Sequence, residues 1–314
     1  MMNDGLYAVV VGSLNFDTIY MQDRLPCRGE TFFARSVSTA PGGKGANQAV
    51  QLAKLGIKTY MVGKVGDDLF GSYMKTQLKS SGVDCTYIGT GKKNTGIAAV
   101  HALPDASAQA TVAPGANMEM LVSEIDTLRH LITGAKVVVL QMEIPRSVTE
   151  HVFRIAKEAG VYVVFNAAPS LEVDDEVLLE ADCLIVNEVE AQHYMHLPAN
   201  SEVVAMIQAG KEFAEKSGHS LIITLGAQGS VLFHSGRIIR YQVDLGLGAV
   251  ETTGCGDSYV GAFAARKALG DQDEDACAFA AAASQITATQ PGAQCAMPTD
   301  EQVRKVLNNK RQSR

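Results

Sequence analysis

The sequence predicts an α/β protein with three layers, in which helices cover both faces of a mostly parallel central sheet. Short apolar runs rich in β-branched residues recur along the chain, and a stretch with helical periodicity follows most of them. The apolar runs are continuous rather than alternating, which is typical of strands buried on both faces of a parallel sheet. The alternation of strands and helices then favours a doubly wound arrangement with right-handed crossovers.

The elements can be placed along the chain from these patterns. The clearest apolar runs predict strands over residues 7–12, 59–66, 136–141, 161–166, 183–187 and 220–226. Helical patterns between them cover residues 45–55, 68–81, 118–133, 147–159 and 201–217. Two further helices are expected near the C-terminus. One has Asp257 in its first turn, and the other is the Ala-rich run 276–289, since alanine favours helix and allows close packing.

Two segments interrupt this alternation, residues 14–40 and 93–113, which carry short strand patterns and turn residues without a helical pattern. They fit either two surface hairpins at the edge of the main sheet or one small sheet built from both. Long irregular insertions in compact domains often cover active sites. We therefore expect the second arrangement, a discontinuous β lid on a single α/β domain that comprises residues 1–314.

Composition and charge disfavour several classes of protein. The net charge of −7 disfavours a nucleic-acid partner, which requires a basic face. No apolar stretch reaches the about 18 residues of a membrane span, and the first residues lack the basic segment of a signal peptide. The six cysteines are scattered without a C-x-x-C pair, which indicates reduced thiols. We expect a cytoplasmic protein that binds neither nucleic acid nor membrane.

Polar residues follow four of the expected strands. Ligands bind beyond the carboxyl ends of strands in such folds, so we expect one polar cleft from Asn15, Asp17, Glu143, Asn187, Glu190, Thr224, Gly226 and Gly229. Asn15 and Asp17 share a face if their segment is extended. An amide beside a carboxylate can bind adjacent hydroxyl groups, as on a sugar. The alternative for this pair is an Asx-type turn.

The segment "APGGKGANQAV" (40–50) precedes an expected helix. Its glycines, Gly43 among them, allow a ligand to approach the backbone closely. Lys44 and Asn47 lie near the helix start, where they can hydrogen-bond that ligand.

A second glycine-rich segment, "VETTGCGDSYVGAF" (250–263), also precedes a helix. Gly254, Cys255 and Gly256 would place backbone N–H groups at the helix N-terminus, which attracts anions such as phosphate. Asp257 either stabilises the first turn or accepts a proton. A phosphate in this position would repel a carboxylate. Asp257 is therefore better explained as a proton acceptor than as a residue that only stabilises the helix. A hydroxyl group that attacks a phosphoryl group needs such an acceptor.

Together these motifs resemble the signatures of the ribokinase (pfkB-type) carbohydrate kinases. The resemblance covers nearly the whole chain, through "GSLNFD", "PGGKGANQA", "VGDDLFG", "PGAN", "LQMEIP", "VNEVEA", "TLGAQGS", "TTGCGDSYVGAF" and "QPGAQ". It implies a ribokinase-like fold and ATP-dependent transfer of the γ-phosphoryl group to a primary hydroxyl of a free sugar, ribose or a related pentose or ketose. It also implies a homodimer that pairs through the lid.

The resemblance implies a role for each matching residue. Asp17, Gly43, Lys44, Asn47 and Glu143 would contact the sugar. Asn187 and Glu190 would organise Mg²⁺ and phosphate through water, and Thr224, Gly226 and Gly229 would border the nucleotide. Gly254, Cys255 and Gly256 would form the anion hole, with Asp257 as the catalytic base. A monovalent cation, K⁺, would be held at Glu251, where the family usually has aspartate, and at Thr253, Thr287, Gln290, Gly292 and Ala296.

Three other functions compete with this interpretation. A nucleoside kinase would use the same base and anion site, and only a substrate survey separates it from a sugar kinase. A nicotinamide-dependent oxidoreductase is disfavoured because no G-x-G-x-x-G follows the first strand. A non-catalytic sugar-binding protein is disfavoured because Asp257 and its glycines are intact.

Overall fold

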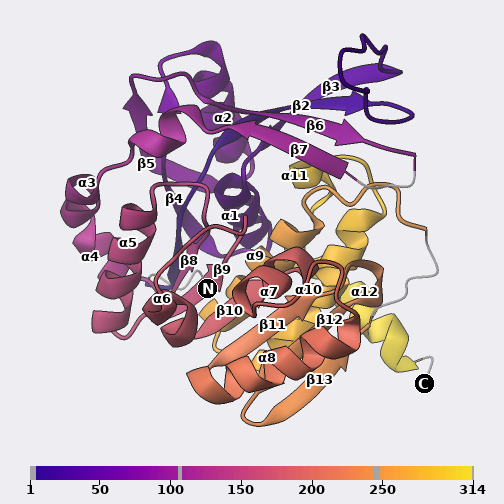
Figure 1. The fold of residues 1–314 in the computed structure, drawn as a ribbon. Helices are drawn as coiled ribbons and strands as arrows, with labels where there is room; N and C mark the ends of the chain where they lie inside the picture. The colour runs from indigo at the N-terminus through magenta and orange to yellow at the C-terminus, as the bar shows by residue number, and fades with distance from the viewer. Residues whose placement is uncertain (1–4, 105–107, 243–247, 313–314) are drawn as a thin grey trace.

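The computed structural model describes residues 5–104, 108–242 and 248–312, and a nine-stranded sheet forms its centre (Figure 1). The strands lie in the order β13-β12-β11-β10-β9-β8-β1-β4-β5. Their bounds are β1 (Tyr7–Val11), β4 (Lys58–Gly66), β5 (Val83–Gly91), β8 (Val137–Leu140), β9 (Tyr162–Asn166), β10 (Cys183–Val186), β11 (Ser220–Thr224), β12 (Ser230–His234) and β13 (Arg237–Tyr241). All neighbours are parallel except β11–β12 and β12–β13, which confirms the mostly parallel sheet.

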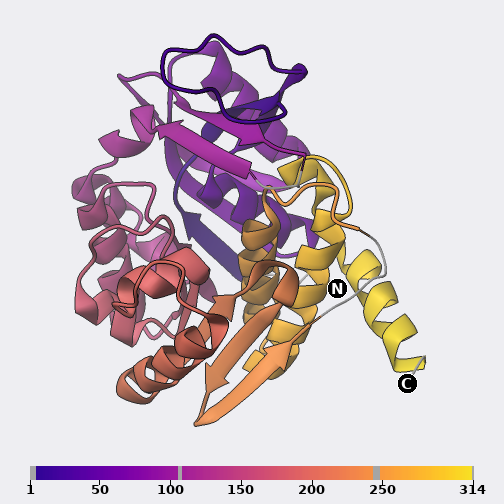
Figure 2. The ribbon, with the colours of Figure 1, turned by 45° about the vertical axis from the view of Figure 1, so that its right-hand side comes forward.

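Helices cover both faces of this sheet (Figures 1 and 2). One face packs against α1 (Lys44–Lys54), α2 (Leu69–Ser80), α9 (Cys255–Ala268), α10 (Asp273–Ala288) and α12 (Asp300–Gln312). The other packs against α3 (Val122–Thr127), α4 (Arg129–Thr133), α5 (Arg146–Glu158), α6 (Asp175–Glu180), α7 (Glu188–Tyr194) and α8 (Val203–Ser217). Strand β1 shows why its run is apolar throughout. Ala8 and Val10 join one core and Val9 and Val11 the other, as side-chain alternation requires.

The prediction of one continuous helix over residues 118–133 is wrong. A 3₁₀ turn, η1 (Gly115–Glu119), comes first, and α3 and α4 follow as separate short helices. The ammonium of Lys64 donates to the carbonyl oxygen of Glu119 at 2.9 Å, so that oxygen bonds a side chain from outside this segment. Met120 then continues in extended backbone, which buries its side chain in the core. Tertiary contacts therefore override the local helical pattern.

The sequence patterns also missed the hairpin of β12 and β13, although a turn signal was present. Ser235 and Gly236 join these strands with φ angles of 50° and 74°. Positive φ at both central residues is the requirement of a tight two-residue hairpin turn. The hairpin adds the two antiparallel strands at one edge of the sheet.

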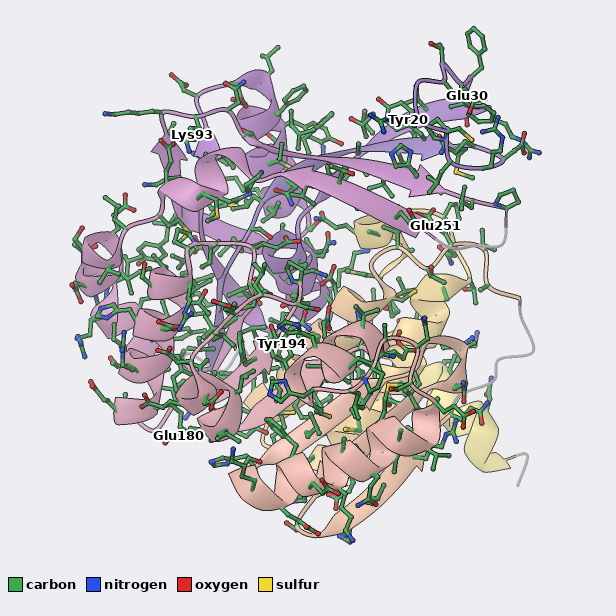
Figure 3. All side chains as sticks on the ribbon, in the orientation of Figure 1. Tyr20, Glu30, Lys93, Glu180, Tyr194 and Glu251 are labelled. Atoms are coloured by element: carbon green, nitrogen blue, oxygen red, sulfur yellow. The ribbon has the colours of Figure 1, made fainter. Side chains whose placement is uncertain are left out.

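A second, four-stranded sheet lies beside the three layers, and Figure 1 shows it extending over α11 (Ala293–Ala296). Its order is β3-β2-β6-β7, with β2 (Asn15–Met21), β3 (Ser36–Gly42), β6 (Gly96–Ala102) and β7 (Ala108–Ala113). Both interrupting segments thus contribute to one small sheet, and residues 105–107 of the second segment lie outside the described residues. Figure 3 shows Tyr20 and Glu30 in this part of the molecule and Glu251 beneath it.

Two further observations concern the chain as a whole. All six cysteines are unpaired. Within residues 5–104, 108–242 and 248–312, every helix is too short or too polar to cross a membrane.

Candidate active site

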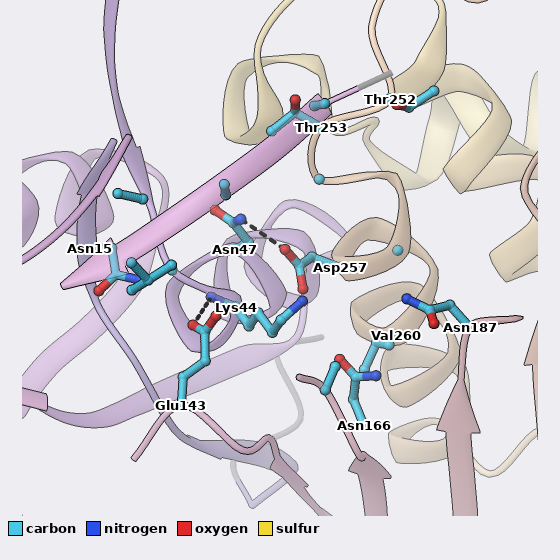
Figure 4. Close-up of a pocket in the computed structure, with 18 of the residues that line it drawn as sticks. Asn15, Lys44, Asn47, Glu143, Asn166, Asn187, Thr252, Thr253, Asp257 and Val260 are labelled. Carbon is cyan, nitrogen blue, oxygen red and sulfur yellow. Dashed lines mark hydrogen bonds between the residues drawn. The ribbon is translucent and has the colours of Figure 1, made fainter. Parts of the chain in front are cut away.

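A cavity of about 400 Å³ lies where the carboxyl ends of β9, β10 and β11 face the small sheet. Residues of β6 and β7 cover it, and the start of α9 closes one side. Most of the predicted site residues line it, many of them drawn in Figure 4: Asn15, Asp17, Gly43, Lys44, Asn47, Glu143, Asn187, Glu190, Thr224, Thr253, Gly254, Gly256 and Asp257. The expected polar cleft at the strand ends is therefore present.

Asp257 lies in the first turn of α9, after Gly254 in the left-handed conformation (φ 78°). Asn47 Nδ2 donates to its Oδ2 at 2.8 Å, and Gln48 Nε2 donates to its Oδ1 at 2.9 Å. Both amides belong to α1, so the carboxylate is held between two packed helices. It still borders the cavity, where a ligand can reach it.

Opposing influences act on the charge of Asp257. Burial raises its pKa above the ordinary value and Glu143 adds to the rise, whereas Lys44 and the two amide donors lower it. The Lys44 side chain runs toward Asp257 (Figure 4). Burial lowers the pKa of Lys44, but the carboxylates of Asp257, Glu143 and Glu190 outweigh it and the net shift is upward. Lys44 therefore stays charged, as a buried ammonium does when carboxylates surround it.

Asn15 and Asp17 face the cavity from alternate positions of β2, as the extended pattern predicts. Asn117 Nδ2 donates to Asn15 Oδ1 at 2.8 Å and so fixes the amide orientation. Oδ1 of Asp17, in contrast, is buried and accepts no hydrogen bond from any described residue. Burial, then the charges of Glu143 and Asp257, raise the pKa of Asp17 to about 7. A buried carboxylate oxygen without a protein donor suits a hydroxyl group of a ligand.

Glu143 ties the loop after β8 to the start of α1. Its Oε2 accepts the Ser13 hydroxyl at 2.5 Å and the backbone N–H of Lys44 at 3.2 Å. Gly43 precedes Lys44 with φ 88°, and a Cβ there would lie 2.7 Å from the backbone nitrogen of Asn15. Only glycine therefore lets the start of α1 lie this close to β2.

Comparisons with known proteins agree with this geometry. The sequence matches the family described as pfkB family carbohydrate kinase over residues 6–300. The chain belongs to this family. It is 33% identical to the ribokinase of Lactococcus lactis over 299 residues, which cover 95% of this chain and 96% of the relative. The deoxyribokinase of Salmonella typhi is 29% identical over 301 residues, 95% of this chain and 98% of the relative.

A solved structure of Arabidopsis thaliana ribokinase, complexed with ribose and ATP, superposes on this kinase with a TM-score of 0.85. The two are 33% identical, and the match covers 96% of this chain and 99% of that one. The ribokinase-like fold expected from the sequence is thus confirmed.

Several predicted residues lie outside the cavity lining: Cys255, Gly226, Gly229, Glu251, Thr287, Gln290, Gly292 and Ala296. Cys255 Sγ lies 3.9 Å from the carbonyl oxygen of Glu251, and burial raises the pKa of the thiol to about 12, which disfavours the nucleophilic thiolate. Gly229 has φ 85°, and a Cβ would lie 2.0 Å from the carbonyl oxygen of Tyr241. The turn into β12 therefore requires glycine at position 229.

The residues predicted to hold a monovalent cation come together in part. Glu251 Oε2 accepts the backbone N–H of Gly292 at 2.9 Å, which joins the segment before α9 to the segment after α10. Two buried oxygens here, Oε1 of Glu251 and Oγ1 of Thr253, have no hydrogen-bond partner among the described residues. Thr287 and Ala296, in contrast, are buried within α10 and α11, and Thr287 Oγ1 bonds Ala283 O at 3.0 Å. Their side chains do not point to a ligand.

Glu190 and Asn187 form a reciprocal cap at the start of α7. The backbone N–H of Asn187 donates to Glu190 Oε2 at 2.8 Å, and the backbone N–H of Glu190 donates to Asn187 Oδ1 at 2.9 Å. The described ranges contain no group of three or more His, Cys, Asp or Glu side chains that could bind a metal ion directly. Any metal ion at Glu190 would therefore need further ligands from substrate or water.

Sequence reasoning missed four buried amides around the site: Gln48, Asn117, Asn166 and Gln294. Three of them lie inside motifs that were recognised, "GGKGANQ", "PGAN" and "QPGAQ". Their contacts join segments more than 100 positions apart. Only the tertiary structure reveals such pairs.

Proposed function

We propose that this carbohydrate kinase transfers the γ-phosphoryl group of ATP to a primary hydroxyl of a free sugar, with ribose as the first candidate and related pentoses or ketoses next. One observation carries the proposal. Asp257, at a helix N-terminus, and Asp17, with an unpartnered oxygen, border the same cavity of about 400 Å³. The relatives named ribokinase support the choice of ribose, and the deoxyribokinase supports a pentose more generally.

The sugar would occupy the part of the cavity near β2. Asn15 and Asp17 supply an amide and a carboxylate from one face of that strand. Gly43, Lys44, Asn47 and Glu143 border the same space. In this position the hydroxyls of the sugar supply the donor that Asp17 Oδ1 lacks.

The phosphoryl group would lie at the start of α9. Gly254 and Gly256 line the cavity, and a Cβ on Gly256 would meet no atom within 4 Å. A helix N-terminus with this open space is suited to a phosphate. The sugar oxygen bonds to the γ-phosphorus as the bond to the leaving oxygen of ADP breaks, and Asp257 accepts the hydroxyl proton. Thr224, Gly226 and Gly229 would border the rest of the nucleotide.

Two cations are part of the proposal. Among the described residues, four carboxylates (those of Asp17, Glu143, Glu190 and Asp257) and one lysine, Lys44, border the cavity. Mg²⁺ would offset their repulsion of ATP, held by phosphate oxygens and, through water, by Glu190. For K⁺, the residues fit a site in part. The oxygens of Glu251 and Thr253 that bond no described residue are available, and the remaining ligands would be backbone carbonyls near Thr287, Gln290, Gly292 and Ala296.

We also propose that the small sheet acts as a lid on a single kinase domain, and that two copies pair through it in the cytoplasm. Its outer strands β3 and β7 are exposed along most of their length, and exposed strand edges invite pairing. Val37 on β3 and Val112 on β7 are exposed apolar residues of those strands. Sedimentation at micromolar concentration should give a dimer, and a monomer would refute the pairing.

An ADP-release assay across ribose, 2-deoxyribose, fructose and adenosine tests the main proposal. We expect ribose or a close relative to give the highest kcat/KM, and the Asp257→Asn variant to lose this activity. Adenosine as the best substrate would replace the sugar kinase with the nucleoside kinase. No substrate-dependent ADP release across the panel would overturn both.

A further inference from the structure

Two relays of side-chain amides converge on Asp257, one on each carboxylate oxygen. On one side, Gln141 Nε2 donates to Gln48 Oε1 at 2.7 Å, and Gln48 Nε2 donates to Asp257 Oδ1 at 2.9 Å. On the other, Gln294 Nε2 donates to Asn47 Oδ1 at 2.9 Å, and Asn47 Nδ2 donates to Asp257 Oδ2 at 2.8 Å. Of these amides, only Asn47 lines the cavity.

Hydrogen-bond partners set the direction of each relay, and Asn166 is itself oriented because its Nδ2 donates to the carbonyl oxygen of Ile185 at 3.0 Å. Because the carbonyl oxygen of Gln48 accepts from Gln141, its NH₂ group is turned toward Asp257 and toward Asn166, whose Oδ1 lies 3.0 Å away. The donation from Gln294 to Asn47 Oδ1 likewise turns the NH₂ group of Asn47 toward Asp257. The amides thus present donors to both oxygens of Asp257. Such surroundings favour a carboxylate over a carboxylic acid, since the acid proton gains no acceptor from them.

The relays are attached to closely packed parts of the fold. Gly261 lets α9 approach α1, because a Cβ there would lie 2.7 Å from Gln51 Cβ and 2.8 Å from the carbonyl oxygen of Gln48. Gln294 belongs to α11, and the ammonium of Lys54 bonds its carbonyl oxygen at 2.7 Å and that of Met297 at 2.9 Å. Lys54 ends α1, the helix that also carries Asn47 and Gln48. One helix therefore holds both relays.

We propose that Gln48 and Gln294 are positioning residues of the kinase, which keep Asp257 ionised and aimed at the cavity although they touch no substrate themselves. The proposal rests on the proposed function, in which Asp257 accepts the hydroxyl proton. It assigns to two buried residues an effect on catalysis that packing alone would not produce.

The charged groups around Asp257 set the direction of the effect. Lys44 on α1 favours its ionised form, while Glu143 disfavours it. Asp17 on β2, Glu190 on α7 and Cys255 on α9 also act on it or are acted on by it. Loss of the Gln48 donor removes one of the influences that keep the pKa of Asp257 down. The base form would then appear only at higher pH.

The test compares Gln48→Met with Gln51→Met. Both glutamines are fully buried on α1, but Gln51 bonds the carbonyl oxygen of Pro298 and the Ser258 hydroxyl instead of Asp257. Methionine keeps the side-chain length and removes the donor. The first readout is the pKa of the Asp257 carboxyl, followed by ¹³C NMR on protein labelled in aspartate, with the signal assigned through Asp257→Asn. The second is the pH profile of kcat.

In Gln48→Met, we expect the pKa of Asp257 to rise by about one unit, since one of its hydrogen bonds is lost. The acid limb of the kcat profile should move to higher pH by the same amount. At pH values below the pKa of Asp257, where kcat follows the ionised fraction, kcat should fall by up to about tenfold, while the KM for sugar stays within about threefold. Gln51→Met should leave the pKa of Asp257 in place, even if it lowers the melting temperature as much.

An unchanged pKa and kcat in Gln48→Met, or an equal shift in Gln51→Met, would overturn the proposal. Should Gln48→Met fail to fold, Gln294→Met tests the second relay with the same two readouts and the same expected direction. The NMR titration does not depend on turnover. If the wild-type protein phosphorylates no sugar, the proposed function fails, and the titration still decides whether the relays hold Asp257 in its ionised form.

Discussion

Asp257 and Asp17 line one cavity and burial raises the pKa of both, yet the protein hydrogen-bonds the two carboxylates differently. Asp257 stands between packed helices, and amide donors meet both of its oxygens. Asp17 lies on the small sheet, where one of its buried oxygens accepts from no described residue, and burial raises its pKa to about 7. The neighbouring strand also packs closely against Asp17, since a Cβ on Gly42 would lie 2.0 Å from Asp17 Oδ2.

This difference separates two tasks of an active site. A group that takes part in the chemical step benefits from complete orientation before the substrate arrives. A group that recognises the substrate gains binding energy when the substrate supplies a missing hydrogen bond. The floor of the cavity around Asp257 fits the first task, and the small sheet with Asp17 fits the second.

Replacement of Asp257 should give the largest effect. We expect Asp257→Asn to lower kcat by about 10²–10⁴, the range for loss of a general base. The KM for sugar should change little, since the amide keeps the shape of the carboxylate. Steady-state kinetics with ribose checks both values. A variant with near-normal kcat would remove Asp257 from the chemical step.

Replacement of Asp17 should act mainly on sugar binding. Asp17→Asn loses hydrogen bonds from hydroxyls to a charged group, and we expect the KM for sugar to rise about 10- to 100-fold. The kcat at saturating sugar should fall much less. Steady-state kinetics with ribose measures both the KM and the kcat of this variant. If kcat falls as far as in Asp257→Asn with KM unchanged, the two carboxylates do not divide the work as we infer.

The raised pKa of Asp17 also predicts a pH dependence of stability without ligand. Because the folded pKa of about 7 lies above the unfolded value of 3.8, this group contributes stability at low pH that is lost as pH rises through 7. At pH 8, Asp17→Asn should therefore be more stable than wild type by about 1–3 kcal/mol. The difference should vanish near pH 4. Denaturant unfolding at the two pH values decides it, and a less stable variant at pH 8 would show that Asp17 has partners in the free protein.

Potassium should have the smallest effect. If K⁺ binds the oxygens of Glu251 and Thr253 that lack a hydrogen-bond partner within the described part of the chain, KCl should raise kcat a few-fold over equal NaCl. Glu251→Gln should reduce this ratio toward one. Equal rates in both salts would remove the cation from the proposal and leave the comparison of the two aspartates intact.

Most of the fold could be predicted from the sequence because the central strands are continuous apolar runs with both faces buried, as in β1 and β8. It failed where contacts from distant segments decide the local structure, as Lys64 does at Glu119. The glycine-rich segments before α1 and α9 also predicted Lys44 and Asp257 as site residues, and both line the cavity. The hydrogen-bond partners of Asp257 could not be predicted from local sequence patterns, since Gln48 and Asp257 are 209 positions apart.

A crystal structure with ribose and a non-hydrolysable ATP analogue tests the division of labour most directly. We predict the primary hydroxyl of ribose within about 2.6–3.2 Å of the Asp257 carboxylate, the reach of a general base. Other sugar hydroxyls should donate to Asp17, and the terminal phosphate should lie at the start of α9. A sugar bound with its primary hydroxyl at Asp17, or a terminal phosphate away from Gly254 and Gly256, would contradict the account.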